Sequence, residues 1–276
     1  MQALWQDGGD GPYELTRLSA SGMQGGECHG WLATTRTPGS SPLPVLVWLH
    51  GGPIGSWTHW LRGWSVPVAL ELGYAVILPD PALSSGYGDE HVSRGWGQWG
   101  QAPLADVTAL MDAAFDGALT PVELDRHRCA VMGGSFGGYL ALQLLINTSR
   151  FRCGVVQSAP ADLARFSETS DSGHYFRREL GVQAVDSLPD LSLLDAPLLL
   201  VHGALDRRVP LEQALALWAR LNEPSLAFDR GHRFLYFPDE GHSIRRAANL
   251  QVWYDVMQRF LATHLLDEPT GRIEWL

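Results

Sequence analysis

Apolar and polar residues follow two different periods along this chain. Short apolar runs rich in β-branched residues predict buried strands, and longer segments with apolar residues every three or four positions predict helices. Strands are expected at Cys28–Thr34, Val45–Leu49, Ala75–Leu78, Cys129–Met132, Gly154–Gln157, Pro197–Val201 and Phe234–Phe237. Helices are expected at Trp60–Leu72, Leu104–Ala118, Gly137–Leu145, Leu211–Leu221 and Ala247–Leu265. This alternation predicts an α/β fold, a mostly parallel central sheet with helices on both faces.

Two stretches lack a clear period. The segment Pro79–Gln101 is rich in Gly and Ser and is expected to be a functional loop, because loops of this length in a compact domain usually carry function. The segment Asp162–Leu188 is expected to be irregular or helical. With no internal repeat in view, we predict one catalytic domain over residues 27–266, a lead-in over 1–26 and a tail over 267–276.

Composition and charge narrow the function classes. Hydrophobic residues make up 45% of the 276 residues, enough for one large core. The net charge of −10, with no basic run, argues against nucleic acid or an anionic membrane as a partner. The cysteines Cys28, Cys129 and Cys153 stand apart in apolar contexts, as buried thiols in a reducing compartment do. With neither a signal-peptide pattern nor a membrane-length apolar run, a cytoplasmic protein is expected.

Metal and cofactor motifs are not apparent. The sequence has no HExxH motif, no Cys/His ligand spacing and no Walker loop. Gly95–Gly100 matches G-x-G-x-x-G, but polar residues precede it where a dinucleotide site needs a strand. We therefore expect no metal and no cofactor.

Gly133–Gly138 reads Gly-Gly-Ser-Phe-Gly-Gly between a predicted strand and an apolar helix. This is the setting of the G-x-S-x-G nucleophile elbow, in which Ser135 occupies a strained turn that neighbouring side chains would obstruct. The helix start places amide dipoles beneath developing negative charge. The alternative is a Gly-rich turn that happens to hold a serine. A general base and a carboxylate elsewhere in the chain would favour the nucleophile elbow.

A serine hydroxyl needs a general base, and the base needs an orienting carboxylate. In a parallel sheet these groups belong beyond the carboxyl ends of the strands. Asp206 follows the strand Pro197–Val201, and His242 follows the strand Phe234–Phe237, whereas His232 precedes that strand and is rejected. His202 is expected to pack at its strand end. The order Ser135, Asp206, His242 is that of the α/β-hydrolase fold.

Donors for a developing oxyanion complete the set. One is expected to be the backbone N–H of Phe136, directly after the nucleophile. The other is expected from His50–Pro53, where Gly51 and Gly52 let the backbone approach a substrate carbonyl. Such a preorganised donor contributes about 2.7–4 kcal/mol in the transition state. These elements together predict a serine hydrolase in which all three members of the triad are present.

With these residues placed, the chain resembles the catalytic domain of the prolyl oligopeptidase family of serine peptidases, notably its acylaminoacyl-peptidase and dipeptidyl-peptidase branches. The resemblance covers roughly residues 28–265 and lies in His50–Pro53, Ser85–Gly88, Gly133–Tyr139, Asp206–Pro210 and Pro238–His242. It implies a triad of Ser135, Asp206 and His242 and oxyanion amides at Phe136 and Gly52. It also implies that Arg208 binds a substrate backbone carbonyl and that Phe166 helps to line the substrate pocket.

The chain also departs from the family. Ala82–Ser85 stands where the family often has Arg-Gly-Ser, and the family's N-terminal β-propeller has no counterpart in this sequence. The face that a propeller covers, expected to carry Trp57, Trp60, Trp96 and Trp99, should then meet another subunit or a separate partner domain.

Three functions follow from these residues. The first is a peptidase acting on peptide, acyl-peptide or aminoacyl-peptide bonds through an acyl-enzyme on Ser135. The second is a carboxylesterase that uses the same triad on a small ester. The third, from another class, is a non-catalytic binding domain that kept the hydrolase fold, against which the complete triad argues.

Overall fold

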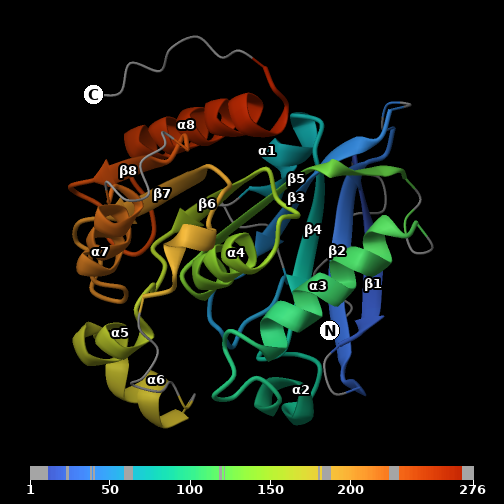
Figure 1. Ribbon diagram of the computed structural model, residues 1–276. Helices are drawn as coiled ribbons and strands as arrows, with labels where there is room; N and C mark the ends of the chain where they lie inside the picture. The colour runs from blue at the N-terminus through green and yellow to red at the C-terminus, as the bar shows by residue number, and fades with distance from the viewer. Residues whose placement is uncertain are drawn as a thin grey trace.

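The computed structural model describes residues 12–22, 25–37, 39, 41–58, 65–117, 120, 122–179, 181, 188–223 and 230–268. Eight strands form one sheet in the order β1-β2-β4-β3-β5-β6-β7-β8 (Figure 1). The strands are β1 (Tyr13–Ser21), β2 (Glu27–Thr35), β3 (Leu43–Leu49), β4 (Ala75–Asp80), β5 (Leu124–Gly134), β6 (Cys153–Gln157), β7 (Leu198–Gly203) and β8 (Arg233–Phe237). β2 pairs antiparallel with β1 and β4, and all the other pairs are parallel.

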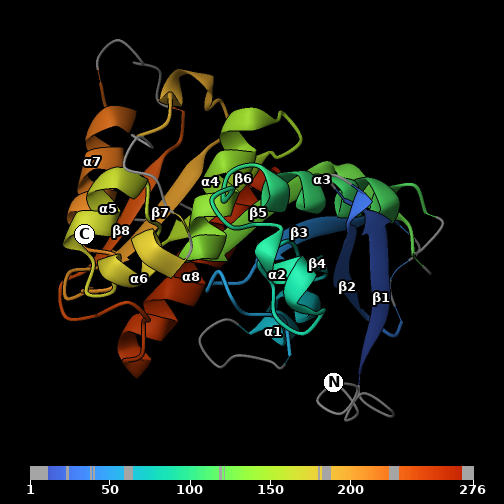
Figure 2. The same cartoon turned by 90° about the horizontal axis from the view of Figure 1, so that it is seen from below.

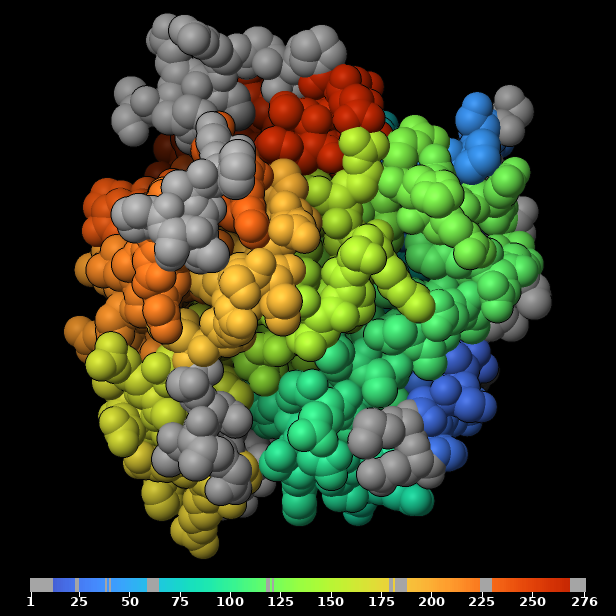
Figure 3. Space-filling view, in the orientation of Figure 1, coloured from blue at the N-terminus to red at the C-terminus, as the bar shows by residue number. Residues whose placement is uncertain are grey.

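Helices cover both faces of this sheet, as the periodicity predicts. One face carries α1 (Val66–Glu71) and α8 (Ala247–Leu265), and its apolar cluster includes Leu70 and Trp253. The other face carries α3 (Ala102–Phe115), α4 (Phe136–Asn147) and α7 (Glu212–Leu221), and its cluster includes Leu110 and Leu140. Figure 3 shows this second face, with α3 in green and α7 in orange. The central strands are therefore buried on both faces, the α/β-hydrolase arrangement.

Further short helices of the described residues lie at one end of the sheet. They are α2 (Asp89–Ser93), α5 (Leu163–Thr169) and α6 (Gly173–Glu179), and the 3₁₀ helix η3 (Leu191–Leu193) precedes β7. Viewed from below in Figure 2, α2, α5 and α6 stand in front of the strands. The described part of the segment Asp162–Leu188, expected to be irregular or helical, thus holds two short helices, and residues 180 and 182–187 lie outside the described residues.

β1 is a strand that the sequence pattern does not predict. It lies within the expected lead-in 1–26, yet it pairs with β2 along its whole length, from Tyr13 opposite Thr35 to Ser21 opposite Glu27. As the edge strand it needs little apolar surface, and Leu18 is its one fully buried residue. The sheet therefore begins before residue 27. Of the expected tail 267–276, only Asp267 and Glu268 are described.

Candidate active site

The turn that holds Ser135, the predicted nucleophile, joins β5 to α4. Ser135 has φ 58° and ψ −124°, a conformation that residues with a side chain rarely adopt. Its backbone N–H donates to the carbonyl oxygen of Gln157 at 2.9 Å. A Cβ atom on Gly133 would collide with the backbone of Gly137, and one on Gly137 with the carbonyl oxygen of Leu49. The strained turn therefore requires glycine at both flanking positions.

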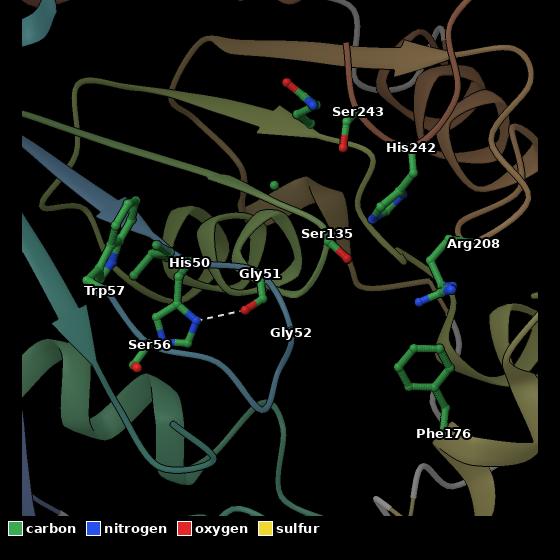
Figure 4. A pocket seen from close by; sticks show the side chains of 13 residues that line it. His50, Gly51, Gly52, Ser56, Trp57, Ser135, Phe176, Arg208, His242 and Ser243 are labelled. Atoms are coloured by element: carbon green, nitrogen blue, oxygen red, sulfur yellow. Dashed lines mark hydrogen bonds between the residues drawn. The ribbon is translucent and has the colours of Figure 1, made fainter. Parts of the chain in front are cut away.

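Asp206 and His242 form an ordered pair at the ends of β7 and β8. His242 Nδ1 lies 2.8 Å from Asp206 Oδ2, and Asp206 is buried. The other carboxylate oxygen, Oδ1, accepts the backbone N–H groups of Arg208 and Val209, each at 2.9 Å. Because a carboxylate accepts, the proton of this pair belongs on Nδ1, which leaves Nε2 as the basic nitrogen. The imidazole extends toward Ser135 (Figure 4).

The two rejected histidines lie where the strand-end argument places them. His202 is fully buried, its Nε2 lies 2.9 Å from the carbonyl oxygen of Val209, and burial lowers its pKa. His232 precedes β8, and its Nδ1 accepts the backbone N–H of Leu198 at the first residue of β7. His202 thus supports the loop that holds Asp206, whereas His232 lies at the amino ends of the strands, away from that loop.

Ser135 and His242 open into one cavity of about 360 Å³. The described residues that line it are Leu49, His50, Gly51, Gly52, Ser56, Trp57, Gly134, Ser135, Gln157, Phe176, Arg208, His242 and Ser243. In Figure 4, Phe176 and Arg208 lie on one side of Ser135, and His50, Ser56 and Trp57 lie on the other. The cavity therefore extends to both sides of the nucleophile.

A buried carboxylate anchors the loop that follows β3. Asp80 at the end of β4 is fully buried and accepts the backbone N–H of Trp57 at 2.8 Å and the hydroxyl of Tyr87 at 2.7 Å. His50 Nε2 lies 2.9 Å from the hydroxyl of Ser84 and 3.5 Å from Asp80. Burial raises the pKa of Asp80. These contacts fix the loop that carries Gly51 and Gly52 at the cavity wall, where Gly52 remains the predicted second oxyanion donor beside Phe136.

Arg208 lines the cavity, and its side chain forms an ion pair. Its Nε donates to Asp171 Oδ1 at 2.6 Å, and the two side chains are 47% and 44% exposed. Burial pushes the pKa of Asp171 upward, but the hydrogen bonds from Arg208 and Ser172, together with the charge of Arg208, outweigh burial and lower the pKa. The α5–α6 loop also binds the Arg208 backbone, because Ser170 Oγ donates to its carbonyl oxygen at 2.6 Å.

The expectation for Phe166 is wrong. Phe166 is 1% exposed and packs against Phe176, with ring centroids 4.7 Å apart, so Phe176 faces the cavity instead. Phe176 also packs edge-on against Trp99, whose ring in turn contacts Phe136 beside the nucleophile. Phe176 falls in the segment without a clear period, and its aromatic character is the one signal that the sequence offers.

The expectation of an exposed tryptophan patch is also largely wrong. Trp57 and Trp99 are 5% and 4% exposed and belong to the two apolar clusters, while Trp96 is 52% exposed. Trp60 lies outside the described residues. The tryptophans beside the site therefore serve mainly to pack its walls.

Other features bear on the class of site. Within the described ranges, no group of three His, Cys, Asp or Glu side chains is placed to hold a metal ion. The three cysteines are free and buried. None of the described helices is long and apolar enough to cross a membrane. The site thus consists of a serine, a histidine and a carboxylate around one cavity.

Sequence comparison finds one family over most of the chain. A model described as the prolyl oligopeptidase family matches residues 60–268. The peptidase YuxL of Bacillus subtilis is 29% identical over 250 residues, which are 86% of this chain and 36% of that protein. A probable dipeptidyl-peptidase 5 of Emericella nidulans is 30% identical over 260 residues, which are 89% of this chain and 35% of that protein. The chain spans about a third of the length of these relatives.

Solved structures share the fold. An acylaminoacyl peptidase of Pyrococcus horikoshii superposes with a TM-score of 0.82 at 23% identity, covering 97% of this chain and 44% of that chain. A puromycin hydrolase superposes with a TM-score of 0.79 at 24% identity, covering 96% of this chain and 41% of that chain. At this identity the likeness concerns the fold.

Proposed function

Because the chain belongs to the prolyl oligopeptidase family, we propose that it hydrolyses peptide bonds through an acyl-enzyme formed on Ser135. The observation that carries the proposal is the hydrogen bond between Asp206 and His242, because His242 lines the same cavity as Ser135, which lies in a strained turn. The relatives' names, peptidase and dipeptidyl-peptidase, support a peptide substrate.

The reaction proceeds in two halves. Ser135 Oγ attacks the scissile carbonyl carbon while His242 Nε2 takes the hydroxyl proton, and Asp206 stabilises the resulting imidazolium. The oxyanion accepts from the backbone N–H groups of Phe136 and Gly52. His242 then donates its proton to the leaving amine, which departs and leaves the acyl-enzyme. Water next attacks the ester with His242 again as base, which frees the acid and restores Ser135.

The acyl part of the substrate lies on the side of Phe176 and Arg208. The guanidinium of Arg208 binds a backbone carbonyl of this part, because its Nε donates to Asp171 and no hydrogen bond within the described ranges uses its other N–H groups. Since Asp171 already balances the charge of Arg208, a neutral carbonyl suits this position better than a carboxylate does. Acyl-peptides and aminoacyl-peptides meet this requirement, and Phe176 supplies the apolar contact for their side chains.

The surface around the cavity favours a covering partner. Ile54, Trp96 and Leu205 lie on segments that follow β3, β4 and β7 and are 42%, 52% and 62% exposed. Such apolar surface around a site marks an interface, and the relatives are much longer than this chain. We therefore propose either a homo-oligomer or docking with a separate domain, to be tested by sedimentation at low micromolar concentration. A monomer equally active on long and short peptides would contradict it.

The buried free thiols of Cys28, Cys129 and Cys153 favour a reducing, cytoplasmic location. Fractionation of the source cells would test this proposal. Recovery of the protein outside the cytoplasm would contradict it.

The function is tested by labelling and by substrate profiling. A fluorophosphonate probe should label the protein, and Ser135→Ala should abolish labelling without unfolding. The labelled enzyme should then cleave acyl- or aminoacyl-peptide substrates, measured beside a nitrophenyl ester. Ester turnover without any peptide cleavage would favour the carboxylesterase. A folded protein that reacts with no probe would refute a serine hydrolase and favour the binding domain.

A further inference from the structure

His50 follows β3 directly, and its ring is bound at both nitrogens. Nδ1 lies 2.8 Å from the carbonyl oxygen of Gly51, and Nε2 lies 2.9 Å from the hydroxyl oxygen of Ser84. Nε2 is also 3.5 Å from Asp80 Oδ1, and only 8% of the His50 side chain is exposed. Ser84 and Asp80 are fully buried. The ring is thus fixed between a buried support and one backbone carbonyl of the loop that lines the cavity.

The carbonyl of Gly51 decides which nitrogen of His50 carries a proton. A carbonyl oxygen only accepts, so Nδ1 must donate. The partner of Nε2 is the hydroxyl of Ser84, which can donate to a neutral ring or accept from a charged one. The hydrogen bond from Nδ1 to Gly51 therefore forms in both protonation states of the ring.

This hydrogen bond also fixes the direction of the next backbone N–H. The Gly51 carbonyl and the Gly52 N–H belong to one trans peptide group, so the two point in opposite directions. Figure 4 shows Gly51 between the His50 ring and Ser135. A Cβ atom on Gly51 would lie 3.5 Å from Ser135 Cβ, so the peptide is close to the nucleophile. Since the carbonyl points to His50, the Gly52 N–H points away from the ring, to the side on which Ser135 lies.

The Gly51–Gly52 peptide has little else to hold it in this orientation. Glycine on both sides lets the peptide group rotate at small steric cost, because neither residue has a Cβ atom. Within the ranges that the structure describes, no acceptor binds the Gly52 N–H, and Gly52 lines the cavity. A reversed peptide would present the Gly51 carbonyl to the cavity, and this oxygen would repel an oxyanion.

We propose that His50 is a positioning residue, whose hydrogen bond to the Gly51 carbonyl holds the Gly52 N–H toward the oxyanion that forms when Ser135 attacks. This inference rests on the proposed acyl-enzyme mechanism. His50 touches no reacting atom in it. The ring acts through one peptide group, and the buried Ser84 and Asp80 hold the ring in place.

A pair of substrates isolates the oxyanion contact. A nitrophenyl ester and the corresponding thionoester differ only in the carbonyl atom, and sulfur is the weaker hydrogen-bond acceptor. The ratio of their kcat/KM values therefore reports how strongly the oxyanion is bound. His50→Leu should lower kcat for the ester about 10²-fold, the cost of one oxyanion donor, with KM unchanged. The thionoester should lose much less, so the ratio of ester to thionoester should fall about tenfold or more.

Two amide variants distinguish the two nitrogens of the ring. The amide nitrogen of Asn lies at the position of Nδ1, and that of Gln lies near the position of Nε2. His50→Asn should therefore keep the bond to Gly51 and a ratio close to the parental one. His50→Gln should keep only the contact with Ser84 and should behave like His50→Leu. A histidine that merely supports the loop through Ser84 would give the reverse order.

His91→Leu is the matched control. His91 is also a buried histidine bonded to a carbonyl oxygen, that of Pro81 at 2.9 Å, but it lies outside the cavity lining. Its loss should leave the ratio of ester to thionoester unchanged, whatever happens to the unfolding free energy. The control thus separates a lost buried histidine from a lost peptide orientation.

Two outcomes would overturn the inference. One is a folded His50→Leu variant with the parental ratio, and the other is a His50→Gln variant that keeps the ratio while His50→Asn loses it. Either result, obtained with variants that still form an acyl-enzyme, would refute the role of His50 alone. If His50→Leu does not fold, the comparison of Asn with Gln decides. A parent protein that forms no acyl-enzyme on Ser135 would refute the proposed function together with this inference.

Discussion

Replacing Asp206 by asparagine tests the orientation of the base more sharply than deleting the side chain. Oδ1 of Asp206 accepts two backbone N–H groups, from Arg208 and Val209, and Oδ2 accepts from His242. In Asp206→Asn the amide oxygen must stay where two donors meet, so the amide nitrogen faces His242. A donor there forces His242 Nδ1 to accept, and the ring proton moves to Nε2. Nε2 then has no lone pair for the Ser135 proton.

The size of the effect follows from this tautomer. The wrong tautomer costs on the order of 10⁴-fold in kcat, about 5.4 kcal/mol at 1.36 kcal/mol per tenfold. Stability should change little, because both backbone N–H groups keep their acceptor. Asp206→Ala, by contrast, leaves two buried N–H groups unsatisfied and should lose about 2–6 kcal/mol of unfolding free energy.

Ester and peptide turnover measured beside urea denaturation distinguishes these variants. The expected result is an Asn variant with near-parental unfolding free energy and almost no kcat, and an Ala variant impaired in both. An Asn variant that keeps a tenth or more of the parental kcat would refute the assignment of the proton to Nδ1. A strongly destabilised Asn variant would refute the backbone-bond argument.

Three further predictions concern the surroundings of the triad. Arg208→Ala should lower kcat/KM for peptides roughly tenfold or more and leave kcat/KM for nitrophenyl esters unchanged. The control variant Arg207→Ala should leave both values unchanged. Equal losses on both substrates would show that Arg208 has a structural role instead. Gly137→Ala should cost at least about 1–3 kcal/mol in urea denaturation, because the new Cβ meets the carbonyls of Leu49 and His50, and an unchanged midpoint would contradict this. Asp80 has a raised pKa, so its contribution to stability is complete below about pH 3.9 and is lost as pH rises. The unfolding free energy of Asp80→Asn relative to the parent should therefore increase with pH above that value, and a pH-independent difference would contradict it.

The sequence predicts the core of the fold and the catalytic groups because both depend on local patterns. Apolar runs locate the central strands, and the carboxyl ends of parallel strands meet at one edge. That rule is sufficient to select His242 over His232 without any knowledge of the tertiary contacts. The pairing of His242 with Asp206 in the structure follows the same logic.

The walls of the site depend on contacts that no local pattern encodes. Phe176 lies in a segment without a clear period, and only the packing of α5 against α6 decides that it rather than Phe166 faces the cavity. The direction of the Gln157 amide is set by Trp253, a residue 96 positions away. β1 escapes detection because an edge strand needs few apolar residues. Long-range partners, absent from periodicity, determine each of these features.

The short backbone segment from Asp206 to Val209 links recognition to chemistry. In the proposed mechanism the Arg208 side chain binds the substrate, while its own backbone N–H donates to the carboxylate that bonds His242. If the proposed contact forms, a poorly seated substrate that pulls on the guanidinium would tilt the backbone N–H that donates to Asp206 and would misalign His242. Discrimination between good and bad peptides should accordingly appear in the rate of acylation more than in the strength of binding, since the enzyme senses fit through the group that performs the reaction.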